Sequence, residues 1–236
     1  MAAEWTYFLN KNPLHVAVGL SRRSVTRDLI GGSGAFCVTL CSESQAELAD
    51  FLGSFSGRDI DKSAAQALDL RAADVIGARW VAGGLAAFEC LVRQTVVTPD
   101  YQVFVGEAVA FHPGTADRPL VKHGPMHALG PRLELTAIVA AANLLPPVGG
   151  RPHLRVAATG RCPDPEAPWL LTLVGSDREE VPLAQCPPGE HDDLMVDLEI
   201  PEPLSAEAVS SCLVKVERSG LKAGWARVLP QPGLWS

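Results

Sequence analysis

Glycine and proline interrupt this chain so often that long helices have little room to form. The 236 residues include 21 glycines and 19 prolines. Between these turn residues lie short segments in which apolar and polar side chains alternate, as they do in half-buried strands. This pattern is more typical of sheets than of helical bundles. We therefore expect a mainly β protein with one large β-rich domain or two small ones.

The clearest strand is expected over residues 14–20, whose sequence is LHVAVGL. Its leucines and valines share one face, whereas Ala17 and Gly19 leave the other face nearly bare. A bare face allows a ligand to approach the backbone closely. A helix over 24–30, ending at Gly31–Gly32, and a second strand over 35–41 should follow.

A capping-box pattern, Ser42 followed by Gln45, predicts a further helix that ends at Gly53. Beyond it, long alternating strands are expected over 86–97 and 101–111, joined by a turn at 98–100. Up to about residue 132, these elements predict a small, mostly antiparallel barrel.

The second half of the chain differs in composition, because thirteen of the nineteen prolines fall in residues 146–236. We therefore expect a first domain over 1–132, a linker over 133–150 and a small β-sandwich over 151–236. Its strands are expected at 154–159, 169–174, 194–200, 212–217 and 225–229.

Charge and composition exclude several classes of protein. The formal charge is −7 and the pI about 5.4, which argues against nucleic acid as a partner. The longest apolar stretch, residues 135–145, is too short to span a membrane, and the N-terminus does not resemble a signal peptide. Six cysteines without a C-x-x-C pair suggest free thiols and a cytoplasmic location, although Cys162–Cys186 or Cys186–Cys212 bridges stay open.

Two segments combine hydroxyl groups with cations and could bind an anion. The loop Gly53–Lys62 contains Ser56, Gly57, Arg58 and Lys62, which suit a phosphate or polyol phosphate. The alternative is a solvated loop in which Arg58 pairs with a neighbouring aspartate. The second segment holds Ser21, Arg22 and Thr26 where a strand meets a helix. Such a corner can bind an anion or can be an ordinary helix cap.

Other chemistry has weaker signals. His123 and His127 are four residues apart, but Gly124 and Pro125 lie between them and make a helical metal site improbable, so no metal is expected. His123 is better suited to a polar contact with a ligand. The sequence has no G-x-S-x-G, Walker or G-x-G-x-x-G motif in the required context.

In chain order, the sequence contains Trp5-Thr6, LHVAVGLSRRSVTRDLI, FLGSFSGRDIDK, FECLV, FVGEAVAFH and KHG. Together, these segments resemble the flavin reductase-like family. The resemblance covers residues 1 to about 130 and is most specific in SGRDIDK. It implies an FMN-binding split β-barrel. Family members have a further strand ahead of the tryptophan, and we expect this strand to be missing here because Met1 stands where an internal methionine would be.

The resemblance also implies a set of flavin contacts. Trp5 and Thr6 would lie beside the flavin, and Ser21, Arg22 and Thr26 at its ring edge and phosphate. Ser56, Gly57, Arg58 and Lys62 would cover the ribityl and phosphate groups, with His123 near the flavin. Lys62 or His123 could stabilise the charge of reduced flavin, while no side chain need act as nucleophile or base.

The expected function is hydride transfer from NADPH or NADH to FMN in a homodimer, with a redox partner protein as a possible acceptor. Two alternatives stay open: an FMN electron-transfer protein without NAD(P)H activity of its own, and a degenerate, non-catalytic binding module. The region 151–236 has no assigned role.

Overall fold

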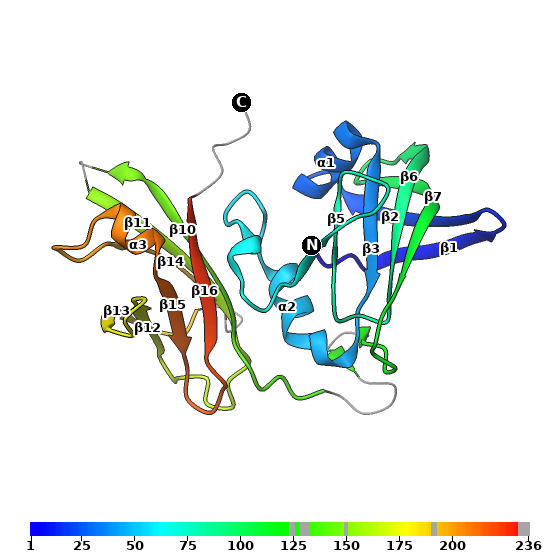
Figure 1. Ribbon diagram of the computed structural model, residues 1–236. Helices are drawn as coiled ribbons and strands as arrows, with labels where there is room; N and C mark the ends of the chain where they lie inside the picture. The colour runs from blue at the N-terminus through cyan, green and yellow to red at the C-terminus, as the bar shows by residue number, and fades with distance from the viewer. Residues whose placement is uncertain (123–125, 128–132, 149–150, 190–192, 231–236) are drawn as a thin grey trace. The chain divides into compact units, whose positions relative to one another are not determined.

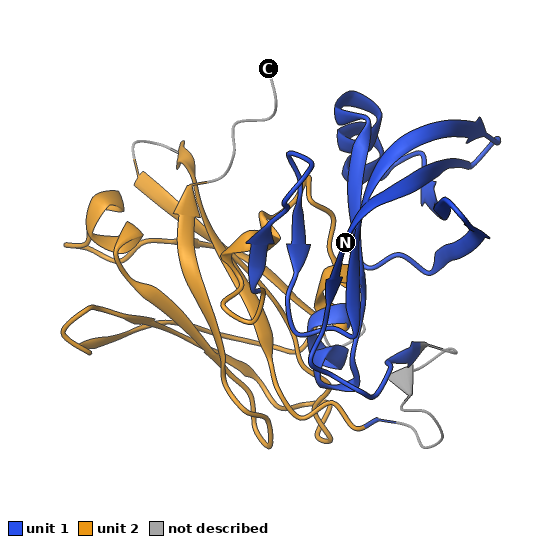
Figure 2. Cartoon of the chain, turned by 45° about the vertical axis from the view of Figure 1, so that its right-hand side comes forward, with its two compact units in different colours: residues 1–49, 69–133 blue, residues 50–68, 134–236 orange. Residues whose placement is uncertain are grey.

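The computed structural model describes residues 1–122, 126–127, 133–148, 151–189 and 193–230. The chain divides into two compact units (Figure 2). Unit 1 comprises Met1–Ala49 and Asp69–Leu133, and unit 2 comprises Asp50–Leu68 and Glu134–Ser236. Strands dominate both units (Figure 1), so the predicted mainly β fold is confirmed.

Unit 1 is built on an antiparallel sheet with the strand order β1-β2-β7-β6-β3. These strands are β1 (Trp5–Lys11), β2 (Leu14–Ser21), β3 (Ala35–Leu40), β6 (Ala86–Val97) and β7 (Tyr101–Pro113). Two small pairs accompany it: β4 (Leu70–Ala72) with β5 (Arg79–Val81), and β8 (Val121–Lys122) with β9 (Met126–His127). The helical segments are α1 (Val25–Ser33), η1 (Glu43–Gln45) and the beginning of α2 (Ala46–Ser54).

The alternating residues of β2 place one face of the strand in the core, as predicted. Val16, Val18 and Leu20 are buried in the core of unit 1 together with Phe36 and Phe104. The long strands β6 and β7 pair across the expected turn, with Val97 opposite Gln102. Apolar periodicity was therefore a sufficient guide to the central strands of this sheet.

Helix boundaries were predicted less well. The α1 helix continues through Gly31–Gly32 and ends at Gly34, whose φ of 66° is left-handed. A Cβ on Gly31 or Gly32 would meet no atom within 4 Å, so neither glycine is required to end the helix. The predicted capping box is present, with Ser42 and Gln45 bonded to each other's backbone.

Unit 2 contains one seven-stranded sheet in the order β13-β12-β15-β16-β10-β11-β14. Its strands are β10 (Val139–Val148), β11 (Arg151–Thr159), β12 (Trp169–Val174), β13 (Glu180–Cys186), β14 (Asp193–Glu199), β15 (Leu213–Glu217) and β16 (Gly224–Pro230). The unit also holds η2 (Lys62–Ala64) and α3 (Ala206–Ser210). Val156, Leu171 and Val214 share one core, so the two ends of the sheet face each other as in a sandwich.

Two boundaries differ from the expected domain division. Most of the expected linker 133–150 is strand β10, which pairs with β11. Pro146–Pro147 coincides with a register shift between Leu145 and Val148, so these prolines interrupt the pairing near the end of the strand and do not mark a linker. In addition, Asp50–Leu68 belongs to unit 2, although its sequence lies within the expected first domain.

Two further properties bear on the sequence analysis. In the part of the chain that is described, no helix is both long and apolar enough to cross a membrane. All six cysteines are unpaired thiols, including Cys162, Cys186 and Cys212, for which bridges had been left open.

Candidate functional site

The segment SGRD forms an exposed turn in unit 2. The Ser56 carbonyl accepts hydrogen bonds from the N–H groups of Asp59 and Ile60 at 3.1 and 3.2 Å. The Ser56 hydroxyl accepts one from the Arg58 N–H at 3.1 Å. Ser56, Gly57 and Arg58 are exposed, whereas Ile60 is 1% exposed. The buried isoleucine therefore anchors a turn whose serine, glycine and arginine are exposed.

Lys62 differs from the expectation that it contacts a phosphate. Its Nζ donates to the carbonyl oxygens of Leu52 and Phe55, each at 2.9 Å. These carbonyls lie at the C-terminal end of α2, where a cation is favourable to the helix dipole. Burial lowers the pKa of Lys62. In this structure, Lys62 thus bonds the backbone at the base of the loop.

A second group of predicted residues lies in unit 1, where β2 meets α1. Ser21 is the last residue of β2, and Thr26 lies in the first turn of α1. Arg22 is tied to the β6–β7 turn, because its Nη1 donates to the Pro99 carbonyl at 3.2 Å and its N–H to the Asp100 carbonyl at 3.0 Å. Ser24 occupies the N-cap position, but its side chain does not bond the helix backbone. The corner therefore combines a cation with a helix N-terminus that its N-cap side chain does not bond, which suits an anion.

Trp5 occupies the bare strand face that was expected to admit a flat ring. A Cβ on Gly19 would lie 3.3 Å from the Trp5 Cβ, so the indole packs directly over this glycine. The indole also stacks on Tyr101, with ring centroids 4.5 Å apart. Trp5 is nevertheless 47% exposed, and Thr6 beside it pairs with Val18. The open aromatic surface is therefore that of Trp5 itself, and the glycine explains why the indole can lie so close to the strand.

The predicted site residues are thus divided between the two units. Unit 1 contains Trp5, Thr6, Ser21, Arg22 and Thr26. Ser56, Gly57, Arg58 and Lys62 belong to unit 2. His123 lies outside the described residues.

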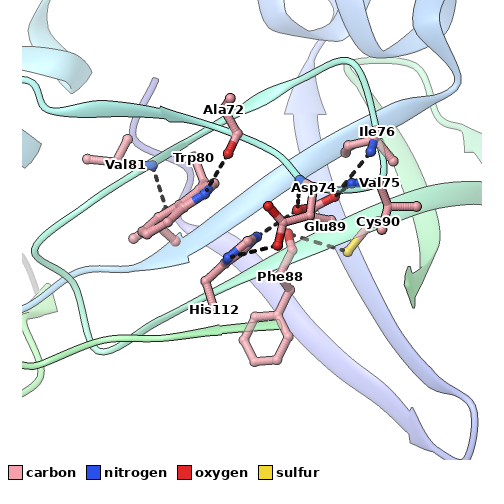
Figure 3. Close-up of polar contacts among 11 residues, drawn as sticks. Ala72, Asp74, Val75, Ile76, Trp80, Val81, Phe88, Glu89, Cys90 and His112 are labelled. Carbon is pink, nitrogen blue, oxygen red and sulfur yellow. Dashed lines mark hydrogen bonds and ion pairs between the residues drawn. The ribbon is translucent and has the colours of Figure 1, made fainter. Parts of the chain in front are cut away.

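A buried carboxylate in unit 1 was not anticipated from the sequence (Figure 3). Glu89, on β6, has no exposed surface and accepts N–H groups from Asp74, Val75 and Ile76 at 2.6, 2.8 and 3.2 Å. Its Oε1 also lies 2.6 Å from the His112 Nε2. In the sequence, Glu89 and His112 each look like one of the polar residues of an alternating strand. No sequence motif indicates that the loop between β4 and β5 contacts them.

These bonds fix the charge of Glu89. Burial by itself raises the pKa of the carboxyl group, but the Asp74 N–H, the His112 ring and the N–H groups of Val75 and Ile76 outweigh it and lower the pKa to about 2. The Trp80 ring stacks on the His112 ring, with the two ring centroids 4.6 Å apart.

Asp74, Glu89 and His112 also bring ligand atoms within 4.8 Å of one another, a spacing that a metal ion could bridge. Both Glu89 oxygens, however, already accept two hydrogen bonds each. A metal could use this carboxylate only at the expense of those bonds, so we interpret the group as a structural clamp on the 74–76 loop.

Comparison with known proteins places the chain in a family. The model of the flavin reductase like domain matches residues 1–127. Among solved structures, a flavoredoxin from Methanosarcina acetivorans is 25% identical, with a TM-score of 0.51 over 57% of this chain and 78% of that one. A flavoredoxin from Desulfovibrio vulgaris (Miyazaki F) shares the fold at 24% identity, with a TM-score of 0.50 over 57% of this chain and 80% of that one.

An uncharacterized protein from Aeropyrum pernix is 31% identical over 113 residues. The match spans 48% of this chain and 43% of that relative, so less than half of the relative is represented. The family model, in contrast, covers more than half of this chain, including the β2–α1 corner and the SGRDIDK loop. The chain therefore belongs to the flavin reductase-like family.

Proposed function

We propose that this protein binds FMN and catalyses hydride transfer from NADH or NADPH to the flavin. The observation that carries the proposal is the exposed SGRD turn, which presents a hydroxyl and a guanidinium within a chain of the flavin reductase-like family. Supporting it, relatives of known structure are named flavoredoxins.

The residues of the loop fit a phosphate monoester. Arg58 supplies a guanidinium that can form two parallel bonds to phosphate oxygens, and Ser56 supplies a hydroxyl donor. Both side chains are exposed on a turn that internal hydrogen bonds hold in shape. Lys62 is assigned here to the loop's support, since its ammonium already has two carbonyl partners.

In unit 1, the Trp5 indole offers a flat surface for an aromatic ring, and Arg22 with the first turn of α1 offers a further place for negative charge. FMN, when bound, accepts the hydride and so supplies the redox chemistry. The chain's own residues need only bind and orient the rings, and none of those described in these two regions needs to act as a base.

An FMN electron-transfer protein without NAD(P)H activity is the second candidate. It is favoured by the similarity to flavoredoxins at TM-scores of 0.51 and 0.50. The two candidates differ in one reaction, the direct reduction of bound FMN by a nicotinamide.

The test is an anaerobic titration of the FMN-loaded full chain with NADH and then NADPH, followed by visible absorption. A reductase loses its flavin bands within the catalytic time range, which is typically seconds or less. An electron carrier keeps them until dithionite is added. The second outcome would refute the hydride-transfer proposal while leaving FMN binding intact.

Two finer proposals accompany this function. We propose a homodimer, since the edge strand β1 exposes Tyr7 and Leu9, with 61% and 58% of their surfaces accessible. We also propose a cytoplasmic location, where six unpaired thiols stay reduced, and a redox partner protein that receives the electrons.

A further inference from the structure

The loop assigned to phosphate binding is held by strands far along the sequence. Asn143, on β10, is fully buried, and its Oδ1 accepts a hydrogen bond from the Asp61 N–H at 2.6 Å. Its Nδ2 donates to the Ala142 carbonyl at 2.9 Å, which fixes the orientation of the amide. An asparagine buried in an apolar sheet is costly unless its polar atoms are bonded. Here one of those bonds is made to the loop.

Arg155, on β11, makes a second connection to the same loop. Its Nε and Nη2 donate to the two oxygens of Asp197 at 2.6 and 2.7 Å. Its Nη1 donates to the Asp59 carbonyl at 3.0 Å. The Asp197 pair holds the guanidinium in one plane, so the bond to the loop comes from a preorganised donor.

The segment that follows the loop is also attached to unit 2. The Gln66 N–H donates to the Trp225 carbonyl at 3.2 Å, and Ala65 forms an antiparallel bridge with Ala226 of β16. Ile60 is buried as well, whereas Ser56, Gly57 and Arg58 are exposed. The backbone on the C-terminal side of this turn is therefore fixed at Asp59, Asp61 and Ala65.

We propose that Asn143 and Arg155 are positioning residues for phosphate binding, and that the C-terminal strands serve to order the Ser56–Arg58 turn. Both residues lie beyond the part of the chain that the family model matches. The inference rests on the proposed FMN function, because it assumes that this turn binds the phosphate. A turn ordered before binding loses less conformational freedom when the ligand arrives, which raises affinity.

The chain offers a closely matched pair of variants. Arg151 also lies on β11 and forms an ion pair with Glu199 of β14, as Arg155 does with Asp197, but none of the interactions described for Arg151 reaches the loop. Arg155→Gln and Arg151→Gln therefore each remove one ion pair to β14, and Arg151→Gln also removes a longer pair with Glu202, at 3.9 Å. Only Arg155→Gln removes a bond to the loop as well.

The experiment measures dissociation constants for FMN and for riboflavin, which lacks the phosphate, by quenching of flavin fluorescence on the full-length chain. We expect Arg155→Gln to weaken FMN binding by about tenfold and to leave riboflavin binding unchanged. Arg151→Gln should change neither value by more than about twofold. Asn143→Ala should show the same selective loss as Arg155→Gln.

Each other outcome has a separate meaning. If wild-type protein binds FMN no better than riboflavin, the phosphate assignment of the loop is wrong and the proposed function fails at this point. If wild type prefers FMN and both Arg155→Gln and Asn143→Ala keep that preference, the positioning role is refuted while the proposed function stands. A parallel loss of FMN and riboflavin binding also refutes it, since that result indicates general destabilisation.

Discussion

Replacing Glu89 with glutamine should destabilise unit 1 strongly at neutral pH. The carboxylate accepts three backbone N–H groups and the His112 ring, divided between its two oxygens. Glutamine has nearly the same shape but presents an NH₂ group to one of these pairs of donors. At least one N–H group then lies buried against another donor, and the charge that strengthened the remaining bonds is lost.

The magnitude follows from the pKa of Glu89. Lowering this pKa from 4.5 to about 2 corresponds to at most about 3 kcal/mol of stabilisation at pH 7. Because the folded-state pKa is depressed, this contribution is present above pH 4.5 and disappears as the pH falls toward 2. We therefore expect Glu89→Gln to lower the free energy of unfolding by about 3 kcal/mol at pH 7, and by progressively less below pH 4.5.

The assay is equilibrium urea unfolding at several pH values, with hydrogen exchange of residues 74–76 as a local readout. Glu107→Gln is the control, because Glu107 pairs with Arg93 at the surface of the same sheet and should cost less than about 1 kcal/mol. A Glu89→Gln loss as small as that of the control, or one that does not diminish in acid, would refute the clamp interpretation.

Three further variants and modifications test other parts of the structure. Arg58→Ala should raise the dissociation constant for FMN by about 10- to 100-fold, the effect of losing a charged phosphate contact, with an unchanged thermal midpoint as the control measurement. Gly106→Ala should destabilise the protein by about 1–3 kcal/mol in urea unfolding. The reason is that the added Cβ would lie 2.7 Å from the Phe36 ring and 2.8 Å from the Cys90 Cβ. A neutral result would mean that the sheet adjusts freely. Burial raises the pKa of the Cys90 thiol to about 12, and Cys37 and Glu89 contribute smaller effects in the same direction. We therefore expect alkylation of Cys90 at pH 8 to be at least about a hundredfold slower in folded than in unfolded protein. Mass spectrometry measures the two rates.

Local patterns were enough to predict most of the individual elements. Alternation located β2, β6, β7 and the expected strands of unit 2, because one buried face imposes a period of two. The capping box at Ser42 was equally direct, since its bonds join residues three apart. The greater part of β10 was missed, because the prolines at 146 and 147 were interpreted as part of a linker, although they lie within the strand. The strand β13, which contains Pro182, was not predicted either.

The features that required the structure all depend on contacts between distant residues. The Lys62 ammonium looked available for phosphate, but the nearby end of α2 gives it two carbonyl partners. The Gly19 face looked open, but the indole of Trp5 on the neighbouring strand covers it. The assignment of Asp50–Leu68 to unit 2 depends on pairings such as Asp61 with Asn143, 82 positions away. No local pattern carries this information.

The most direct test of the account is whether the purified full chain retains FMN. The protein is incubated with excess FMN, separated by gel filtration, and examined for the visible absorption bands of the flavin. We predict that the bands elute with the protein in stoichiometric amount and that Arg58→Ala reduces them. If the flavin elutes entirely separately from the wild-type protein, the central claim that this chain is a flavoprotein is contradicted.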